Sequence, residues 1–294
     1  MSTETGAPVV VGVDGSPSAL AAVRLAAREA ALRRRPLRVV HAFIWPQLKV
    51  PLGPAPAGPP DGGLRNQAEH ILAEAVGEAT RAAPDRVVIH AIVDGSPAPV
   101  LLRESRRAAL LVLGYQGLGA IAGALIGSVA TQVAAHAACP VMVARGDDRA
   151  DGPVVVGVDG SPLSELAVGF AVEEAALRGA AVVVLHARTQ SLPAAFGQPQ
   201  APVSDIDALD ADENVALAAT VAGWRERYPQ VPITHRLVQG RATKVFVTES
   251  GGAQLLVVGA RGRGGFPGLR LGAVSHAVLH HGCCPLTIVQ QPQP

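Results

Sequence analysis

Two glycine-rich segments have a composition and spacing that could hold phosphate groups. GYQGLGAIAGALIGS places glycines at Gly114, Gly117 and Gly127, and GARGRGGFPGLRLGA repeats that spacing from Gly259. Glycine lets the backbone turn and lets an anion approach it without meeting a Cβ atom. The third glycine opens a segment with helical periodicity, and a helix N-terminus favours an anion. The pattern predicts a phosphate-binding loop, with a flexible loop as the alternative in a chain of 32 glycines.

An aspartate follows the same apolar run in each half of the chain. Asp14 comes directly after VVVGV at 9–13, and Asp159 comes after the same five letters at 154–158. The serine two residues further on is better placed to cap the next helix, because a proline follows it. Ligands of open α/β sheets bind outside the carboxyl ends of the strands. Both carboxylates are therefore predicted to face a ligand.

Arginine distinguishes the second glycine segment from the first. Arg261 and Arg263 stand where the first segment has Gln116 and Leu118. Exposed basic side chains are usually solvated and nothing more. Beside a phosphate-binding loop, however, a guanidinium can donate charge-assisted hydrogen bonds to phosphate oxygens, so we predict phosphate contact here.

No arrangement typical of a dedicated enzyme is present. The Walker GxxxxGK(S/T), GxSxG and HExxH motifs do not occur in the sequence. His41 and His186 lie inside apolar runs, where a hydrogen-bonded core histidine is more common than a catalyst. We therefore predict no catalytic residues and at most weak turnover.

Cysteine and histidine near the end of each half permit two further interpretations. The spacings His136-x2-Cys139 and His281-x2-Cys284 could contribute to a zinc site, and the vicinal pair Cys283-Cys284 could be redox-active. Each spacing falls at a helix-to-strand junction, so a buried structural cysteine is the simpler interpretation. Three cysteines are too few for a disulfide framework and fit a reducing compartment.

Charge and hydropathy argue against nucleic-acid binding, membrane insertion and secretion. The formal net charge is +1, so the chain has no overall attraction to polyanions. MSTETGAPVV at the start lacks the features of a secretory signal, and a cytoplasmic location is expected. Residues 108–144 contain no Asp, Glu, Lys or Arg, but glycines and Pro140 interrupt the run, so we interpret it as strand, loop, helix and strand.

The chain contains two copies of one sequence unit. VVVGVDGSP occurs at 9–17 and again at 154–162, an offset of 145 residues that holds along the whole chain. This is a tandem duplication, and the charged stretch ARGDDRADGP at 144–153 is the joint. Two domains are predicted, at residues 1–146 and 152–294.

Short apolar runs alternate with amphipathic segments in each copy. In the first copy, strands are predicted near Val9–Val13, Leu37–Phe43, Val87–Val93, Leu110–Leu113 and Val141–Ala144. Helices are predicted near Pro17–Arg34, Leu64–Ala82, Ala98–Arg107 and Ser128–Ala137. Strands that are continuous in Val and Leu are buried on both faces. The predicted fold class is α/β, with two doubly wound Rossmann-like domains, each a five-stranded parallel sheet with helices on both faces.

These motifs together resemble the universal stress protein family in its tandem two-domain form. The resemblance rests on VGVDGS at the first strand, a His-Ala pair on the second (41–42 and 186–187), and G-x2-G-x9-G-(Ser/Thr) after the fourth. It covers nearly the whole chain. The glycine motif marks the ATP-binding branch of that family, so the resemblance implies that ATP is the ligand and that Mg arrives with its phosphates near Asp14 and Asp159.

Carried over position by position, the resemblance implies one nucleotide site in each half. The first-half residues implied are Asp14, Ala42, Gly114, Gly117, Gly127, Ser128 and Val129. The second-half residues are Asp159, Ala187, Gly259, Arg261, Gly262, Arg263, Gly272, Ala273, Val274 and Ser275. Ala273 departs from the Ser/Thr of the motif, and Ser275 supplies a hydroxyl two residues on. We expect both halves to bind ATP, with unequal affinity.

The expected function is that of an ATP-binding stress regulator in which the nucleotide acts as a binding switch. A slow Mg-dependent ATPase or nucleotidyl-transfer enzyme is the alternative, and a structural module without nucleotide is a third possibility. The family also implies pairing through the edge strands Val141–Ala144 and Leu286–Gln290, between halves or in a homodimer. The loops Trp45–Gly63 and Ser191–Asp210 differ most between the copies and are predicted to determine the protein partner.

Overall fold

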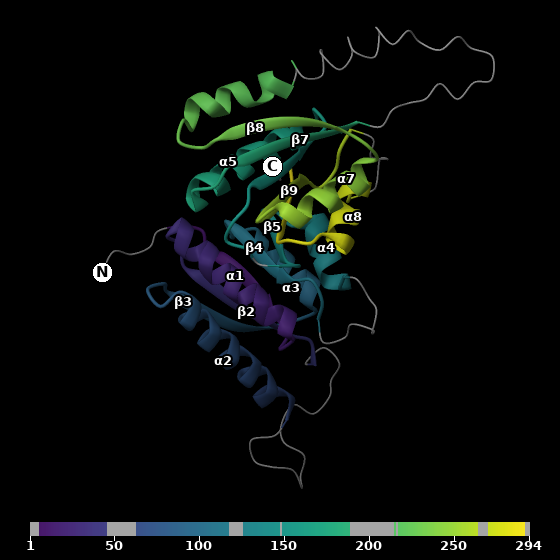
Figure 1. The fold of residues 1–294 in the computed structure, drawn as a ribbon. Coiled ribbons are helices and arrows are strands. Elements are labelled where there is room, and N and C mark those ends of the chain that lie inside the picture. Colours follow the sequence, from purple (N-terminus) through teal and green to yellow (C-terminus); the bar gives the residue numbers. More distant parts are fainter. Residues whose placement is uncertain are drawn as a thin grey trace, which may run out of the picture. The chain divides into compact units, whose positions relative to one another are not determined.

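The computed structural model describes residues 6–45, 63–117, 126–147, 149–188, 215, 217–263 and 270–291. The chain divides into two compact units (Figure 1). Unit 1 contains Met1–Gly146 together with Pro285–Pro294, and unit 2 contains Asp147–Cys284.

Unit 1 is built on a parallel sheet. Its strands are β1 (Val9–Val13), β2 (Leu37–Phe43), β3 (Val88–Asp94), β4 (Leu110–Gly114) and β5 (Val141–Ala144), in the order β3-β2-β1-β4-β5. The helices are α1 (Pro17–Arg33), α2 (Leu64–Ala82), α3 (Pro97–Ser105) and α4 (Ser128–His136). α1 packs against α2, and α3 packs against α4 (Figure 1). The predicted doubly wound fold is confirmed, and the strand order reverses between β1 and β4.

Unit 2 repeats four of these five strands, so the five-stranded sheet predicted for the second half is not complete within unit 2. Its strands are β6 (Val154–Val158), β7 (Val182–Arg188), β8 (Ile233–Gln239) and β9 (Leu255–Gly259), which pair in parallel in the order β9-β6-β7-β8. Its helical segments are α5 (Pro162–Arg178), residues 217–227, α7 (Ala242–Glu249), the short 3-10 helix η2 (Ser250–Gly252) and α8 (Ala273–His281). The order reverses between β6 and β9, the equivalents of β1 and β4.

The central strands form the core because both of their faces are covered. Every residue of β1 and β5 is buried, as are four of the five residues of β4 and of β9. β3 is an edge strand and has exposed residues on it, among them Ile89. This contrast is what continuous Val/Leu runs predict for strands buried between two helical layers. Among the described residues, no helix has both the length and the apolar character needed to cross a membrane.

The strand at the end of the chain belongs to unit 1. β10 (Leu286–Val289) runs antiparallel to β5, with Leu286 opposite Val143 and Ile288 opposite Val141. The two edge strands that were expected to pair therefore do so within one chain. The pairing covers the outer edge of β5, an apolar strand that would otherwise present unpaired backbone groups.

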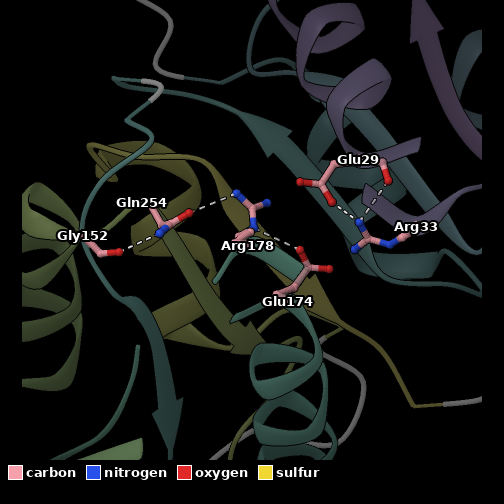
Figure 2. A network of polar contacts seen from close by, with 6 residues as sticks. All are labelled: Glu29, Arg33, Gly152, Glu174, Arg178 and Gln254. Carbon is pink, nitrogen blue, oxygen red and sulfur yellow. Dashed lines mark hydrogen bonds and ion pairs between the residues drawn. The ribbon is translucent and has the colours of Figure 1, made fainter. Parts of the chain in front are cut away.

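Each unit contains a buried glutamate at the same position of its first helix. Glu29 in α1 pairs with Arg33, and Glu174 in α5 pairs with Arg178 at 3.2 Å; both glutamates are only 1% exposed. Arg178 also donates to the side chain of Gln254, which in turn donates to the carbonyl of Gly152 (Figure 2). The duplication has therefore preserved a buried ion pair along with the glycine loops.

Breaking this pair is expected to destabilise the fold. Arg33→Ala leaves the Glu29 carboxylate buried without its arginine, which costs about 3 kcal/mol or more. Urea denaturation measures the loss in the free energy of unfolding. Arg81→Ala is the matched control, because Arg81 is exposed in its ion pair with Glu78 and its removal should cost much less. A loss for Arg33→Ala no larger than that of the control would contradict a structural role for the buried pair.

Candidate functional site

Each unit contains a cavity at the carboxyl ends of the two strands where its strand order reverses. The unit 1 cavity has a volume of about 450 Å³ and lies at the ends of β1 and β4. The unit 2 cavity has a volume of about 500 Å³ and lies at the ends of β6 and β9. Such volumes suit a small-molecule ligand, and this edge is where doubly wound sheets bind ligands.

The predicted site residues come together at these cavities. The unit 1 lining contains all seven residues named for the first half: Asp14, Ala42, Gly114, Gly117, Gly127, Ser128 and Val129. The unit 2 lining contains all ten residues named for the second half: Asp159, Ala187, Gly259, Arg261, Gly262, Arg263, Gly272, Ala273, Val274 and Ser275. Residues more than 110 positions apart in the sequence thus share one wall in each unit.

The two aspartates are positioned by the turn between the first strand and the first helix. The Ser16 hydroxyl caps α1 by accepting from the Ala19 N–H at 3.1 Å, and Ser161 caps α5 in the same way. The prediction that these serines cap the helices is confirmed. Each aspartate also accepts a hydrogen bond within the same turn. One oxygen of Asp14 accepts from the Ser16 N–H at 3.0 Å, which orients the carboxylate.

Several hydrogen-bond donors surround Asp159. Burial desolvates this carboxyl group and would raise its pKa, but hydrogen bonds outweigh that effect and hold the pKa below its usual value. The donors are the Ser161 hydroxyl at 2.6 Å, the Arg263 N–H at 2.7 Å and the Ser161 N–H at 3.0 Å. Asp159 is therefore ionised at neutral pH and can accept hydrogen bonds from a ligand hydroxyl or hold a metal-bridged phosphate.

The middle glycine of each loop lies directly against this carboxylate. A Cβ atom on Gly117 would come within 2.5 Å of Asp14 Oδ2, and one on Gly262 would collide with Asp159 Oδ2. Real Cβ contacts are not that short, so a side chain at either position must displace the carboxylate. The first glycine has a different role from the one expected of it. A Cβ on Gly114 would meet the Ser18 hydroxyl at 2.5 Å and the Ser18 backbone at 2.7 Å, so this glycine allows α1 to pack closely.

The third glycine is not required by packing against its described neighbours. A Cβ on Gly127 would meet nothing closer than 3.6 Å, and one on Gly272 nothing closer than 3.5 Å. In both cases the added atom would lie within 3.7 Å of the middle glycine's backbone nitrogen. The absence of a side chain here therefore keeps space open over the loop backbone rather than relieving a clash.

The same glycines leave two helix N-termini without a side-chain cap. Gly127 precedes α4 and Gly272 precedes α8, and among the described residues neither helix has a side-chain capping bond at its N-terminus. The first N–H groups of a helix have no partner within it, and α1 and α5 use serine for this purpose. The first residues of α4 and α8 line the cavities instead. An anion in either cavity could accept from these N–H groups.

Ser275 does not take the place of the missing hydroxyl at Ala273. Its side chain is 2% exposed, and its hydroxyl donates to the carbonyls of Gly259, at 2.7 Å, and Ala260, at 3.1 Å. The hydroxyl proton therefore joins the start of α8 to the end of β9. Ser128 of unit 1, in contrast, is exposed on its cavity wall.

The two strand histidines have a structural hydrogen bond. His41 Nδ1 donates to the Val13 carbonyl at 2.9 Å, and His186 Nδ1 donates to the Val158 carbonyl at 2.8 Å. Each bond crosses between neighbouring strands directly before the aspartate. Ala42 and Ala187, the next residues, line the cavities with their small side chains.

The floor of each cavity was missed by sequence reasoning. Pro97 and Leu101 of α3 line the unit 1 cavity, and Ala242 and Phe246 of α7 line that of unit 2. The available signal was the glycine inside VVVGV, because glycine within a strand marks a close approach. A Cβ on Gly12 would come within 2.9 Å of the Leu101 side chain, and Gly157 has the same relation to Phe246 at 2.8 Å.

The cysteines do not form a metal cluster in the described part of the chain. Among the described residues, no group of three or more His, Cys, Asp or Glu side chains could hold a metal ion. Cys139 and Cys284 are buried, and desolvation raises the pKa of each thiol to about 12. Cys283 is exposed. The predicted partner loops, Trp45–Gly63 and Ser191–Asp210, fall almost wholly outside the described residues.

Comparison with known proteins identifies the class. The universal stress protein family model matches residues 7–145 and again residues 152–290. This chain belongs to that family and contains two of its domains in tandem. The universal stress protein Rv2005c of Mycobacterium tuberculosis is 38% identical over 298 residues, which cover 96% of this chain and 97% of that protein.

A solved structure that spans both units agrees on the fold. A universal stress protein from Archaeoglobus fulgidus superposes with a TM-score of 0.69 and 16% identity, covering 97% of this chain and 99% of that chain. A universal stress protein from the same organism in complex with dAMP is 25% identical over 48% of this chain and 98% of that chain, with a TM-score of 0.34. The dAMP is a ligand of that second protein.

The loop geometry predicts the effect of a side chain at the middle glycine. Gly117→Glu and Gly262→Glu should each abolish ligand binding in their own unit, because the side chain displaces the aspartate and adds negative charge to the cavity. Isothermal titration with ATP measures the sites that remain, and circular dichroism checks the fold. Gly77→Glu in α2 is the control, because a Cβ there meets nothing within 4 Å. Unchanged binding in the substituted unit would show that the loop is not the binding site.

The thiol environments predict selective alkylation. Only the Cys283 thiol should react with iodoacetamide in the native protein at neutral pH, because the other two are buried and held protonated. All three should react in denaturant. Mass spectrometry of the alkylated peptides distinguishes them, and Cys283→Ser should eliminate native labelling. Fast native labelling of Cys139 or Cys284 would show that these thiols are not buried.

Proposed function

We propose that this protein is an ATP-binding regulator of the universal stress protein family, in which each unit holds one nucleotide. The observation that supports this most directly is the uncapped N-terminus of α4 and of α8, each open to a cavity beside an aspartate and a glycine loop. Backbone N–H groups, a helix dipole and open space over a glycine are the elements of a phosphate site.

The remaining walls suit the rest of an adenine nucleotide. The phosphates would lie along the loop and the start of α4 or α8, and the ribose hydroxyls would meet Asp14 or Asp159. The base would lie toward Ala42 or Ala187, whose small side chains leave room at the strand end. Asp14 or Asp159 would help to hold Mg that arrives with the phosphates, because Mg is commonly bound through one or two carboxylates plus substrate phosphates.

We propose a binding switch rather than turnover. The described lining residues of each cavity provide one carboxylate and no neutral histidine or lysine to pair with it as acid and base. A nucleotide that binds one arrangement of the loop better than another shifts the population toward that arrangement. A slow Mg-dependent ATPase remains the rival, and multiple-turnover phosphate release distinguishes the two. Turnover at ordinary enzymatic rates that is lost in Asp14→Ala and Asp159→Ala would overturn the regulatory proposal.

The third glycine provides the sharpest test of the nucleotide proposal. Gly127→Ala should fold normally, because the methyl group has space, yet it should weaken ATP binding in unit 1 by about tenfold or more by covering the loop backbone. Gly272→Ala should do the same in unit 2. Thermal unfolding checks the fold, and titration with ATP measures the affinity.

Co-purified ligand offers an independent check. Mass spectrometry of the protein after denaturation should find adenine nucleotide in the wild type, and less of it in Gly127→Ala combined with Gly272→Ala. A variant with normal stability and unchanged nucleotide content would remove the support for the phosphate site.

A further inference from the structure

In unit 1, hydroxyl groups of the first helix hold the glycine loop. The backbone N–H of Gln116 donates to the Ser18 hydroxyl at 3.2 Å, and the Ser16 hydroxyl donates to the Gln116 carbonyl at 3.3 Å. These serines belong to the start of α1 and its cap. Neither of these two hydrogen bonds involves a charged group.

In unit 2, an arginine of the loop itself makes the equivalent attachment. Leu163 stands at the position of Ser18, so one of those hydroxyl groups is missing. The Arg263 N–H donates to Asp159 at 2.7 Å, and its guanidinium donates to the Gly160 carbonyl at 2.9 Å. Gly160 has no side chain, and a Cβ atom there would collide with the guanidinium. The guanidinium therefore fits over the turn between β6 and α5 because that turn has a glycine.

The charges on the two cavity walls also differ. The described residues that line the unit 1 cavity include one charged side chain, Asp14. The unit 2 lining includes Asp159 together with Arg261 and Arg263. The formal charge of the described lining is thus −1 in unit 1 and +1 in unit 2. The sequence between the first and third glycines shows the same contrast, with no charged residue at 114–127 and three arginines at 259–272.

The guanidinium of Arg263 has a better acceptor available when phosphate is present. A carbonyl oxygen is neutral, and this hydrogen bond is exposed to solvent. Phosphate oxygens are charged and match the planar arrangement of guanidinium donors, so their hydrogen bonds to arginine are stronger. A phosphate in the unit 2 cavity can therefore replace the Gly160 carbonyl as the acceptor of the Arg263 guanidinium. This exchange also changes the hydrogen bonds that hold the glycine loop.

We infer that Arg263 makes the unit 2 cavity selective for nucleotides with a long, highly charged phosphate chain, by exchanging the Gly160 carbonyl for a phosphate oxygen. The unit 1 cavity, which has no cationic side chain on its described wall, discriminates little between a nucleoside monophosphate and a triphosphate. The first site then reports the presence of adenine nucleotide, and the second reports its phosphorylation. This inference rests on the proposed nucleotide binding.

Chains with a single working cavity test this inference. Gly262→Glu leaves the unit 1 cavity, and Gly117→Glu leaves the unit 2 cavity. Each chain is titrated with ATP and with AMP. The dissociation constant for AMP divided by that for ATP is the selectivity ratio. We expect this ratio to be at least about tenfold higher for the unit 2 cavity, since hydrogen bonds between charged groups are worth that much.

Substitution of Arg263 assigns the selectivity. In the Gly117→Glu background, Arg263→Leu, which copies the residue at 118, should lower the ratio to that of the unit 1 cavity mainly by weakening ATP. Arg270→Leu is the matched control, because Arg270 is an exposed arginine of the same loop that is not in the cavity lining. Leu118→Arg in the Gly262→Glu background, which places an arginine at the position that matches Arg263, should raise the ratio of the unit 1 cavity.

The possible outcomes separate this inference from the proposed function. Equal ratios in the two cavities, or equal effects of Arg263→Leu and Arg270→Leu, would overturn the inference while nucleotide binding stands. No binding of ATP or AMP by either single-cavity chain or by the wild type would overturn the proposed function and the inference together. Circular dichroism of every variant confirms that the ratios come from folded protein.

Discussion

The contact between an aspartate at the end of the first strand and the backbone of the glycine loop determines the site in each unit. Asp14 Oδ2 lies 2.5 Å from the position that a Cβ atom of Gly117 would occupy, so the loop can close on the carboxylate only if that residue is glycine. The contact joins the carboxyl end of β1 to that of β4, where the strand order reverses. The cavity, the uncapped helix and the proposed phosphate position all depend on this closure.

The duplication shows which parts of the arrangement are tied to this contact and which can change. Both units keep the aspartate, the three glycines, the histidine bonded to the preceding strand and the buried glutamate of the first helix. They differ in what holds the loop, through hydroxyl groups in unit 1 and Arg263 in unit 2. Closure of the loop on the aspartate is therefore common to both sites, while the chemistry that a ligand meets there has diverged.

Much of this could be predicted from the sequence, because the relevant signals are local or repeated. Continuous valine and leucine runs identified the central strands, and the strand order places residues as distant as Asp14 and Gly117 at one edge of the sheet. The floor of the cavity could not be predicted in this way. Leu101 and Phe246 reach the cavity because Gly12 and Gly157 allow the helix to approach the strand. The only sign of such a packing contact in the sequence is one glycine within the strand.

Side-chain roles were also harder to predict than side-chain positions. Ser275 was expected to supply a hydroxyl to the ligand, and it lines the cavity, but its proton bonds the carbonyls of Gly259 and Ala260. Gly114 was expected to admit a phosphate, yet it makes room for Ser18. In both cases the competing partner is a group from a neighbouring element, and the spacing of residues within a motif contains no information about that partner.

The central claim is that each unit holds one adenine nucleotide at its glycine loop, and a count of bound nucleotides tests it most directly. Native mass spectrometry of the full chain titrated with ATP and Mg should reveal a species with two nucleotides per chain. Gly117→Glu and Gly262→Glu should each reduce this to one, and the two together should reduce it to none. A wild-type chain that binds no nucleotide, or a double variant that still binds two, would contradict the account.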